Sequence, residues 1–141
     1  MAKVPDHSAV TPLRRMAVAR GTLALRPATC KALESEGAEL LATGKVAAIV
    51  AAKRAGTDVP TALGVHLTDA FCDLSVEDSQ VVCTMTVQAV ARQTLEAHAL
   101  AGCAAALLAL WDAAKAMEQD ADGNFPAAKV TGLGVVQNVV L

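Results

Sequence analysis

Hydrophobic and polar positions along the chain predict four strands. Residues 67–76 and 81–90 have the composition of two strands joined by the polar turn at 77–80, and residues 15–25 alternate weakly as a first strand. Residues 127–141 form a last β-rich segment. The strand at 81–90 is the clearest, because its apolar and polar side chains alternate between two faces. The apolar face consists of Val81, Cys83, Met85, Val87 and Ala89, and the polar face of Thr84, Thr86 and Gln88.

Three helices are predicted between these strands. Residues 27–37 begin with a proline suited to a first helical turn and end with a glycine suited to a helix stop. Residues 43–55 carry apolar residues at helical spacing, and residues 94–116 form a long third helix that is rich in alanine and leucine. The apolar residues of the second helix are Val46, Ile49 and Val50.

The long helix carries a continuous apolar stripe. Steps of three and four residues place its members on one side of the helix, and Leu108 and Trp111 widen the stripe beyond one side. A small domain has little sheet with which to cover a helix on two sides, so a partner subunit is expected to supply the additional cover. The stripe consists of Leu100, Cys103, Leu107, Leu110, Ala114 and Met117.

The order β-α-α-β-β-α-β predicts an α+β fold in which helices pack on one face of an antiparallel sheet. A length of 141 residues suits one domain. We expect residues 1–13, which are polar and contain two prolines, to form a flexible N-terminal arm, and residues 14–141 to form the single domain.

Composition excludes several classes of function. The net charge is −2, and the chain has two Phe, one Trp and no Tyr, so neither a basic patch nor a stacking platform for nucleic acid is expected. The apolar run 99–111 is shorter than the roughly 20 residues that cross a bilayer, and the N-terminus lacks a secretory signal. These features indicate a cytoplasmic protein. The four cysteines are scattered, which predicts buried reduced thiols, no metal site and no cofactor.

Polar residues gather at the two ends of the long helix. Asp112 and Lys115 are three positions apart and therefore lie within reach of each other, as a solvated ion pair or as part of a site. Glu96 and His98 lie roughly 20 Å away along a straight helix. The two groups can share one site only if a neighbouring subunit brings opposite ends together or if Gly102 bends the helix.

From Arg15 to Met117 the chain resembles the MoaC family, the cyclic pyranopterin monophosphate synthases of molybdenum cofactor biosynthesis. The stretches that carry the resemblance are LLATGKVAAIVAAKRAGTDVP, LEAHALAGCAAALLALWDAAKAM and the strands between them. They correspond in order and spacing to the family's AT-R-A-I-AAKR helix, its I-P-L-C-H-P-L loop, its G-V-E-M-E-A-L-T helix start and its Y-D-M-C-K-A helix end.

The resemblance implies a ferredoxin-like α+β subunit in a homohexamer, a trimer of dimers with active sites between subunits. It also implies a lyase or cyclase that rearranges a phosphorylated small molecule by acid/base catalysis. Asp112, Lys115 and Glu96 match the family's catalytic motifs, and His98 occupies the position of its second glutamate. The expected substrate-binding residues are Lys53 and Arg54, which match the Lys-Arg pair, Lys45, which replaces an arginine, and His66.

The chain departs from the family pattern at several positions. Ala62 and Leu63 replace the Cys and His of the L-C-H-P-L loop, and His66 follows three positions later as a possible substitute. A family lysine is absent near Gly37, and VTGLGVVQNVVL replaces the C-terminal K-S-G-G-K-S-G run. Two hypotheses follow. The chain is either a diverged lyase or cyclase that acts on a different, less phosphorylated substrate, or a non-catalytic subunit that retains the oligomeric fold.

Overall fold

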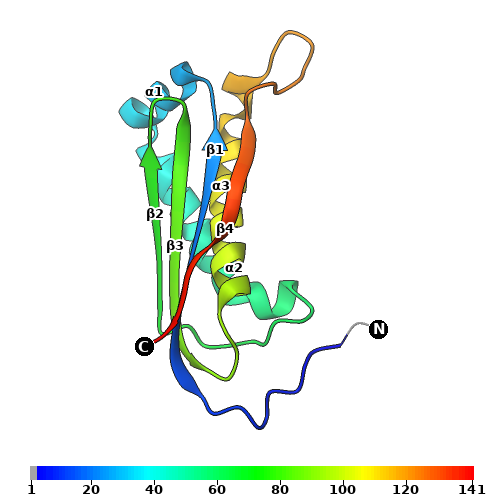
Figure 1. The fold of residues 1–141 in the computed structure, drawn as a ribbon. Coiled ribbons are helices and arrows are strands. Elements are labelled where there is room, and N and C mark those ends of the chain that lie inside the picture. Colours follow the sequence, from blue (N-terminus) through cyan, green and yellow to red (C-terminus); the bar gives the residue numbers. More distant parts are fainter. Residues whose placement is uncertain (1–2) are drawn as a thin grey trace.

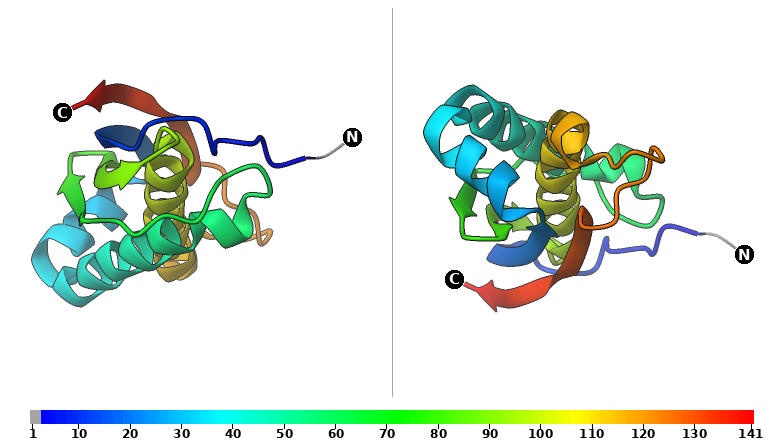
Figure 2. Two further views of the ribbon diagram at one scale, coloured as in Figure 1. Left: turned by 90° about the horizontal axis from the view of Figure 1, so that it is seen from below. Right: turned by 90° about the horizontal axis from the view of Figure 1, so that it is seen from above.

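A computed structural model describes residues 3–141 as a four-stranded antiparallel sheet with three helices on one face (Figures 1 and 2). The strands follow the order β2-β3-β1-β4, and the α+β class is confirmed. Residues 1–2 of the predicted N-terminal arm lie outside the described part. In chain order the elements are β1 (Leu13–Ala24), α1 (Pro27–Glu36), α2 (Ala38–Asp58), β2 (Asp69–Val76), β3 (Gln80–Ala91), α3 (Glu96–Glu118) and β4 (Lys129–Val140).

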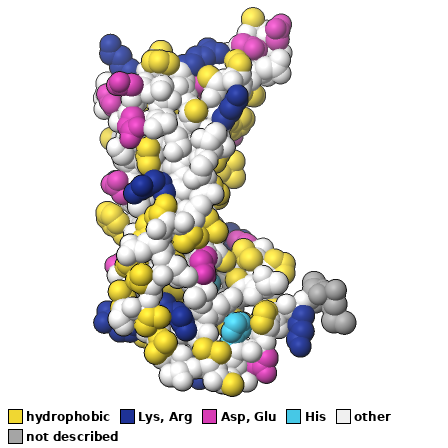
Figure 3. All heavy atoms as spheres, viewed as in Figure 1, with side chains coloured by type: hydrophobic (Ala, Val, Ile, Leu, Met, Phe, Trp, Pro, Cys, Tyr) yellow, Lys and Arg dark blue, Asp and Glu magenta, His cyan; other side chains and the backbone are white. Residues whose placement is uncertain are grey.

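The centre of the sheet is regular and its β4 edge is not. β1 and β3 pair without interruption from Leu13↔Ala91 to Ala24↔Gln80. The five apolar residues predicted for the inner face of β3 are all buried against the helices. β1 and β4 pair with two register shifts, and β4 contains Gly132 at φ +64°, a conformation that favours glycine. Figure 3 shows hydrophobic side chains at the surface of the opposite face of the sheet, where Phe71 is 60% exposed.

α2 and α3 pack closely because both present small residues to each other. A Cβ added at Gly102 of α3 would lie 2.9 Å from the Ala48 carbonyl oxygen of α2, and one at Gly44 would lie 3.4 Å from Leu110. α3 is one uninterrupted helix through Gly102, so this glycine serves close packing and does not divide the helix. The buried residues of α2 are Gly44, Ala48, Ala52 and Ala55.

The apolar residues predicted to mark α2 do not form its buried face. Val46 is 60% exposed and Val50 is 47% exposed, and the helix extends beyond the predicted 43–55 at both ends. The small residues occupy the contact with α3 because they allow the two backbones to approach, which leaves the larger valines on the outside. Periodicity identified the helix correctly but not the side that packs.

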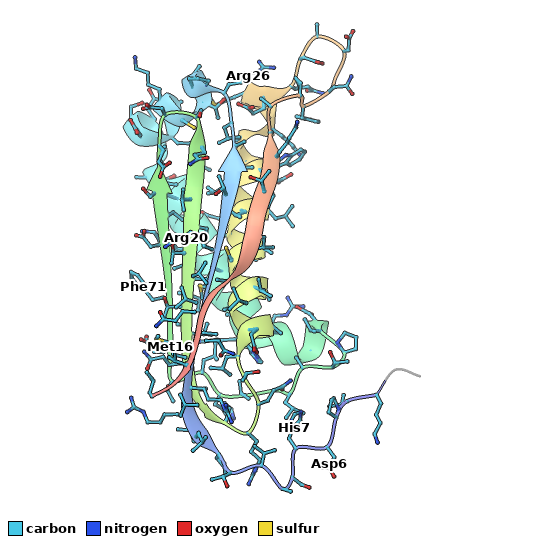
Figure 4. The ribbon with its side chains drawn as sticks, in the orientation of Figure 1. Asp6, His7, Met16, Arg20, Arg26 and Phe71 are labelled. Atoms are coloured by element: carbon cyan, nitrogen blue, oxygen red, sulfur yellow. The ribbon has the colours of Figure 1, made fainter. Side chains whose placement is uncertain are left out.

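The C-terminal end of the apolar stripe on α3 also differs from the sequence prediction. Met117 is 49% exposed, whereas the neighbouring Glu118 is completely buried. The Glu118 carboxylate accepts hydrogen bonds from the backbone N–H of Arg26, at 3.1 Å, and from the hydroxyl of Thr29. Arg26 stands where α1 begins (Figure 4), so this carboxylate caps α1 from the end of α3.

The outer side of α3 is only partly covered within one subunit. Leu108 is 65% exposed, although Ala99, Cys103, Leu107 and Leu110 are buried. Among the described residues, α3 is the one helix whose length and apolar composition would suffice to cross a membrane. Core helices pass the same test, and α3 contacts α2, β1, β3 and β4.

Substitution Gly102→Ala should destabilise the protein. Alanine favours a helix over glycine by up to about 1 kcal/mol, but the new methyl group would meet the Ala48 carbonyl and force the two helices apart. We expect a net loss of about 1–3 kcal/mol in the free energy of unfolding, measured by chemical denaturation. Gly134→Ala is the control, because a Cβ there has no neighbour within 4 Å. A Gly102→Ala protein as stable as the wild type would contradict the proposed packing constraint.

Candidate functional site

Asp112 and Lys115 form an ion pair on the exposed side of α3. Lys115 Nζ lies 2.7 Å from Asp112 Oδ1, as the i,i+3 spacing predicted, and both side chains are more than half exposed. Asp112 borders a shallow groove of about 450 Å³ that is otherwise apolar. The pair is therefore hydrated in the single subunit and lies beside a surface suited to burial. The groove is lined by Ala105, Leu108, Ala109, Trp111 and Asp112.

Trp111 holds one side of this groove in a fixed position. Its indole Nε1 donates a hydrogen bond to the carbonyl of Ala128 at 3.3 Å. Its ring also packs against Phe125, with 4.9 Å between ring centroids. The segment between α3 and β4 thus fixes the aromatic ring next to Asp112, which gives the groove a defined shape.

Glu96 lies at the opposite end of α3, where β4 ends. Its carboxylate accepts a hydrogen bond from Asn138 Nδ2 at 2.8 Å. Because α3 is continuous, roughly 20 Å of helix separates Glu96 and His98 from the Asp112–Lys115 pair. One subunit therefore does not bring these four predicted catalytic residues together.

His98 is buried without a hydrogen-bond partner. It is 1% exposed, and neither Nδ1 nor Nε2 has a partner within residues 3–141. Burial lowers the pKa of His98, because the charged ring would lose its hydration. The polar backbone of Leu63 raises the pKa by a smaller amount, so the net shift is downward. Leu63 itself donates its N–H to Gln93 Oε1 at 2.7 Å, so the segment 59–68 is held close to the start of α3.

Lys53 and His66 line the same hollow, which has a volume of about 590 Å³. α2 contributes Lys53, and the segment after α2 contributes His66. This segment packs directly on α2, because a Cβ at Gly56 would lie only 2.5 Å from the Cα of Gly64. Two of the four predicted substrate-binding residues are thus brought together. The lining residues are Lys53, Gly56, Thr57, Gly64, Val65, His66 and Leu67.

The other two predicted binding residues lie outside this hollow. Arg54 forms an exposed ion pair with Asp58, with 3.3 Å between Nη2 and Oδ1. Lys45 is exposed two turns earlier on α2. The structure adds Arg92, which lines a second hollow of about 290 Å³ that also includes His66. The sequence places Arg92 shortly after the strand predicted at 81–90, which was the one signal available. Only the folded chain shows that Arg92 and His66 line the same hollow.

The four cysteines are buried and reduced, as predicted. Three of them gather between the sheet and α3, which their spacing did not indicate. The sulfurs of Cys72 and Cys83 are 3.7 Å apart, and the Cys103 sulfur lies 3.7 Å from the Cys83 carbonyl oxygen. Hydrogen bonding with Cys103 and Cys72, together with burial, raises the pKa of the Cys83 thiol. These thiols fill the core beneath α3 and lie away from the two hollows.

Comparison with known sequences gives consistent relatives over nearly the whole chain. A sequence model of the MoaC family matches residues 4–137. Probable cyclic pyranopterin monophosphate synthases are 34% identical in Aeropyrum pernix, over 92% of this chain and 91% of the relative, and 34% identical in Methanoregula boonei, over 96% and 90%. A Methanothermobacter thermautotrophicus protein named as a probable accessory protein of this synthase is 31% identical over 89% and 80%.

The buried His98 should make stability depend on pH. Its pKa is lower in the folded chain than the ordinary value near 6.5, so below about pH 6.5 the unfolded chain takes up the proton more readily. The free energy of unfolding should therefore fall as the pH is lowered from 7 to 5, by at most about 1.4 kcal/mol per pH unit from this group. His98→Leu should flatten this part of the profile, measured by denaturant unfolding at each pH.

His66→Leu is the matched control, because it replaces an exposed histidine by the same residue. Equal slopes for the wild type and His98→Leu would show that His98 is not held neutral by burial.

Proposed function

Because this chain belongs to the MoaC family, we propose that it is a cytoplasmic lyase or cyclase related to the cyclic pyranopterin monophosphate synthases and diverged to act on a different small molecule. The match over residues 4–137 supports the family reaction type, an acid/base rearrangement without a metal or cofactor. Divergence is supported by Ala62 and Leu63, which stand where the family has Cys and His. Apolar side chains at these positions cannot donate a proton or bind a phosphate.

The observation that carries the proposal is the Asp112–Lys115 pair beside an exposed apolar groove. As a surface ion pair it would contribute at most about 1 kcal/mol to stability. A second subunit that covers Leu108 and Trp111 would exclude water from the pair and place a substrate against the Lys115 amine. Lys115 then transfers a proton to or from the substrate, and Asp112 holds the amine in position by its 2.7 Å contact.

Glu96 completes this site from a neighbouring subunit, whereas the predicted catalytic His98 is 1% exposed, stays inside its own chain and does not reach the substrate. The helix length prevents one chain from supplying both ends of the site, and a closed assembly repeats the same contact around its symmetry axes. We propose a homohexamer built as a trimer of dimers. The exposed Leu108 on α3 and the exposed apolar residues of β4 supply the surface that such contacts bury.

Lys53 and His66 bind the substrate in the hollow that they line, and Arg54 and Lys45 contribute positive charge outside it. A lysine and a histidine suit an anionic group on a small molecule. The substrate carries fewer phosphate groups than that of the family's synthases, because the lysines of the family's C-terminal run have no counterpart in this chain.

A non-catalytic role is the alternative, and one observation favours it. The Methanothermobacter relative is named as an accessory protein of the synthase, at 31% identity. A structural or regulatory subunit would retain the oligomeric surfaces without a need for the Asp112–Lys115 pair.

The chain should not restore molybdenum cofactor synthesis in cells that lack their own cyclic pyranopterin monophosphate synthase. The Cys and His of the family loop are replaced, so the standard substrate loses binding and proton-transfer groups. The measurement is the activity of a molybdenum enzyme in the complemented strain, with an ordinary family member as the positive control. Full rescue by the wild-type chain would contradict the altered substrate.

The same strain separates the alternative role when it carries a limiting amount of an ordinary synthase. An accessory subunit would raise the activity of the molybdenum enzyme, and Lys115→Ala would not change that increase. An enzyme with a different substrate should give no increase.

A further inference from the structure

Three neighbouring hollows at one end of the sheet are lined by basic side chains and by no acidic side chain. The Lys53 hollow and the Arg92 hollow share Gly64, Val65 and His66, and Val90 joins the Arg92 hollow to a third that contains two more arginines. No Asp or Glu side chain lines any of the three, although the whole chain has a net charge of −2. The third hollow is lined by Arg14, Arg15, Thr68, Gln88, Ala89, Val90 and Leu141.

A hollow at the opposite end of the molecule does not share this basic lining. A hollow of about 320 Å³ beside α1 is lined by one lysine and three carboxylates, namely Lys31, Glu34, Glu77 and Asp78. Clefts that are lined by one sign of charge focus the electrostatic potential and concentrate ligands of the opposite sign. The cationic end therefore suits an anionic ligand.

Arg92 is placed to contact such a ligand. It follows β3 directly, and its Nε donates a hydrogen bond to the carbonyl of Val10 at 3.2 Å. Val10 belongs to the arm that also carries Asp6 and His7 (Figure 4), and Pro12 of this arm lines the Arg92 hollow. Within residues 3–141 the terminal nitrogens of Arg92 form no hydrogen bond or ion pair. One edge of the guanidinium is thus fixed, and the other donors are available.

We propose that Arg92 is a second ligand anchor, and that the ligand is a small molecule with two anionic groups, one bound at Lys53 and the other at Arg92. The ligand passes over the shared wall formed by Gly64, Val65 and His66. The inference rests on the proposed binding role of Lys53 and adds the second anchor and the ligand class. A planar guanidinium binds a phosphate or carboxylate through two parallel hydrogen bonds, which gives the second group a defined orientation.

The test uses tripolyphosphate as a flexible polyanionic probe and isothermal titration of the full-length chain in its native assembly at low ionic strength. Lys53→Gln and Arg92→Gln should each weaken binding about tenfold or more, as expected for the loss of a charged hydrogen-bonding partner. Lys129→Gln is the matched control. It removes the same charge, yet Lys129 is an exposed residue at the start of β4 and lines none of the three hollows, so binding should change less than twofold.

Arg92 also holds the arm, so a structural effect must be separated from a ligand contact. Arg92→Lys keeps the charge, but a single amine cannot contact the Val10 carbonyl and also bind the ligand at two points. This variant should bind the probe with an affinity between those of the wild type and Arg92→Gln. Its melting temperature should equal that of the wild type. A loss of binding by Arg92→Gln no larger than that of Lys129→Gln, or parallel losses of binding and melting temperature across both Arg92 variants, would overturn the second anchor.

The Lys53 variant separates the second anchor at Arg92 from the binding role proposed for Lys53. Weakened binding by Lys53→Gln without an effect of Arg92→Gln would overturn the second anchor alone. No effect of either substitution, or no binding of the probe to the wild-type chain, would overturn both the second anchor and the proposed binding role of Lys53.

Discussion

The close contact between α2 and α3 is the constraint on which the other features depend. Gly102 meets the backbone of Ala48 without a side chain between them, and Gly44 packs against the side chain of Leu110 and the carbonyl of Ala106. Because the helix backbones approach so closely, α2 places Lys53 at the rim of the cationic end, while the inner side of α3 covers the sheet. Larger residues at these contacts would separate the helices and move the hollow away from the start of α3.

The same contact determines which surfaces remain open. Small residues fill the helix interface, so the larger apolar side chains of both helices, such as Val46 and Leu108, face outward. The outer side of α3 then combines a fixed tryptophan, an apolar groove and the Asp112–Lys115 pair. Exposed apolar surface of this kind, next to polar groups, is typical of an interface. The proposed shared site would account for the polar residues at the two ends of one helix.

Sequence patterns predicted the fold well because its elements are long and strongly periodic. The strand at 81–90 and the α3 stripe were recognisable from alternation and helical spacing, and the spacing of Asp112 and Lys115 gave their contact. Periodicity could not show which side of α2 packs, since glycine and alanine carry little hydrophobic signal. It also could not place Glu118, because the partners of this carboxylate lie 89 and 92 positions away. The meeting of Lys53, His66 and Arg92 depends on the path of segment 59–68, which no local pattern determines.

If opposite ends of α3 from two subunits form one site, a short crosslinker should join them. Glu96→Cys subunits are mixed with Asp112→Cys subunits and treated with a bismaleimide much shorter than the roughly 20 Å between these positions on one helix. The native cysteines are buried and should not react. We expect a covalent dimer in the mixture and none when Asp73→Cys, exposed on the edge strand β2, replaces Asp112→Cys. Absence of the crosslink, with subunit exchange demonstrated by native mass spectrometry, would contradict a site shared between subunits.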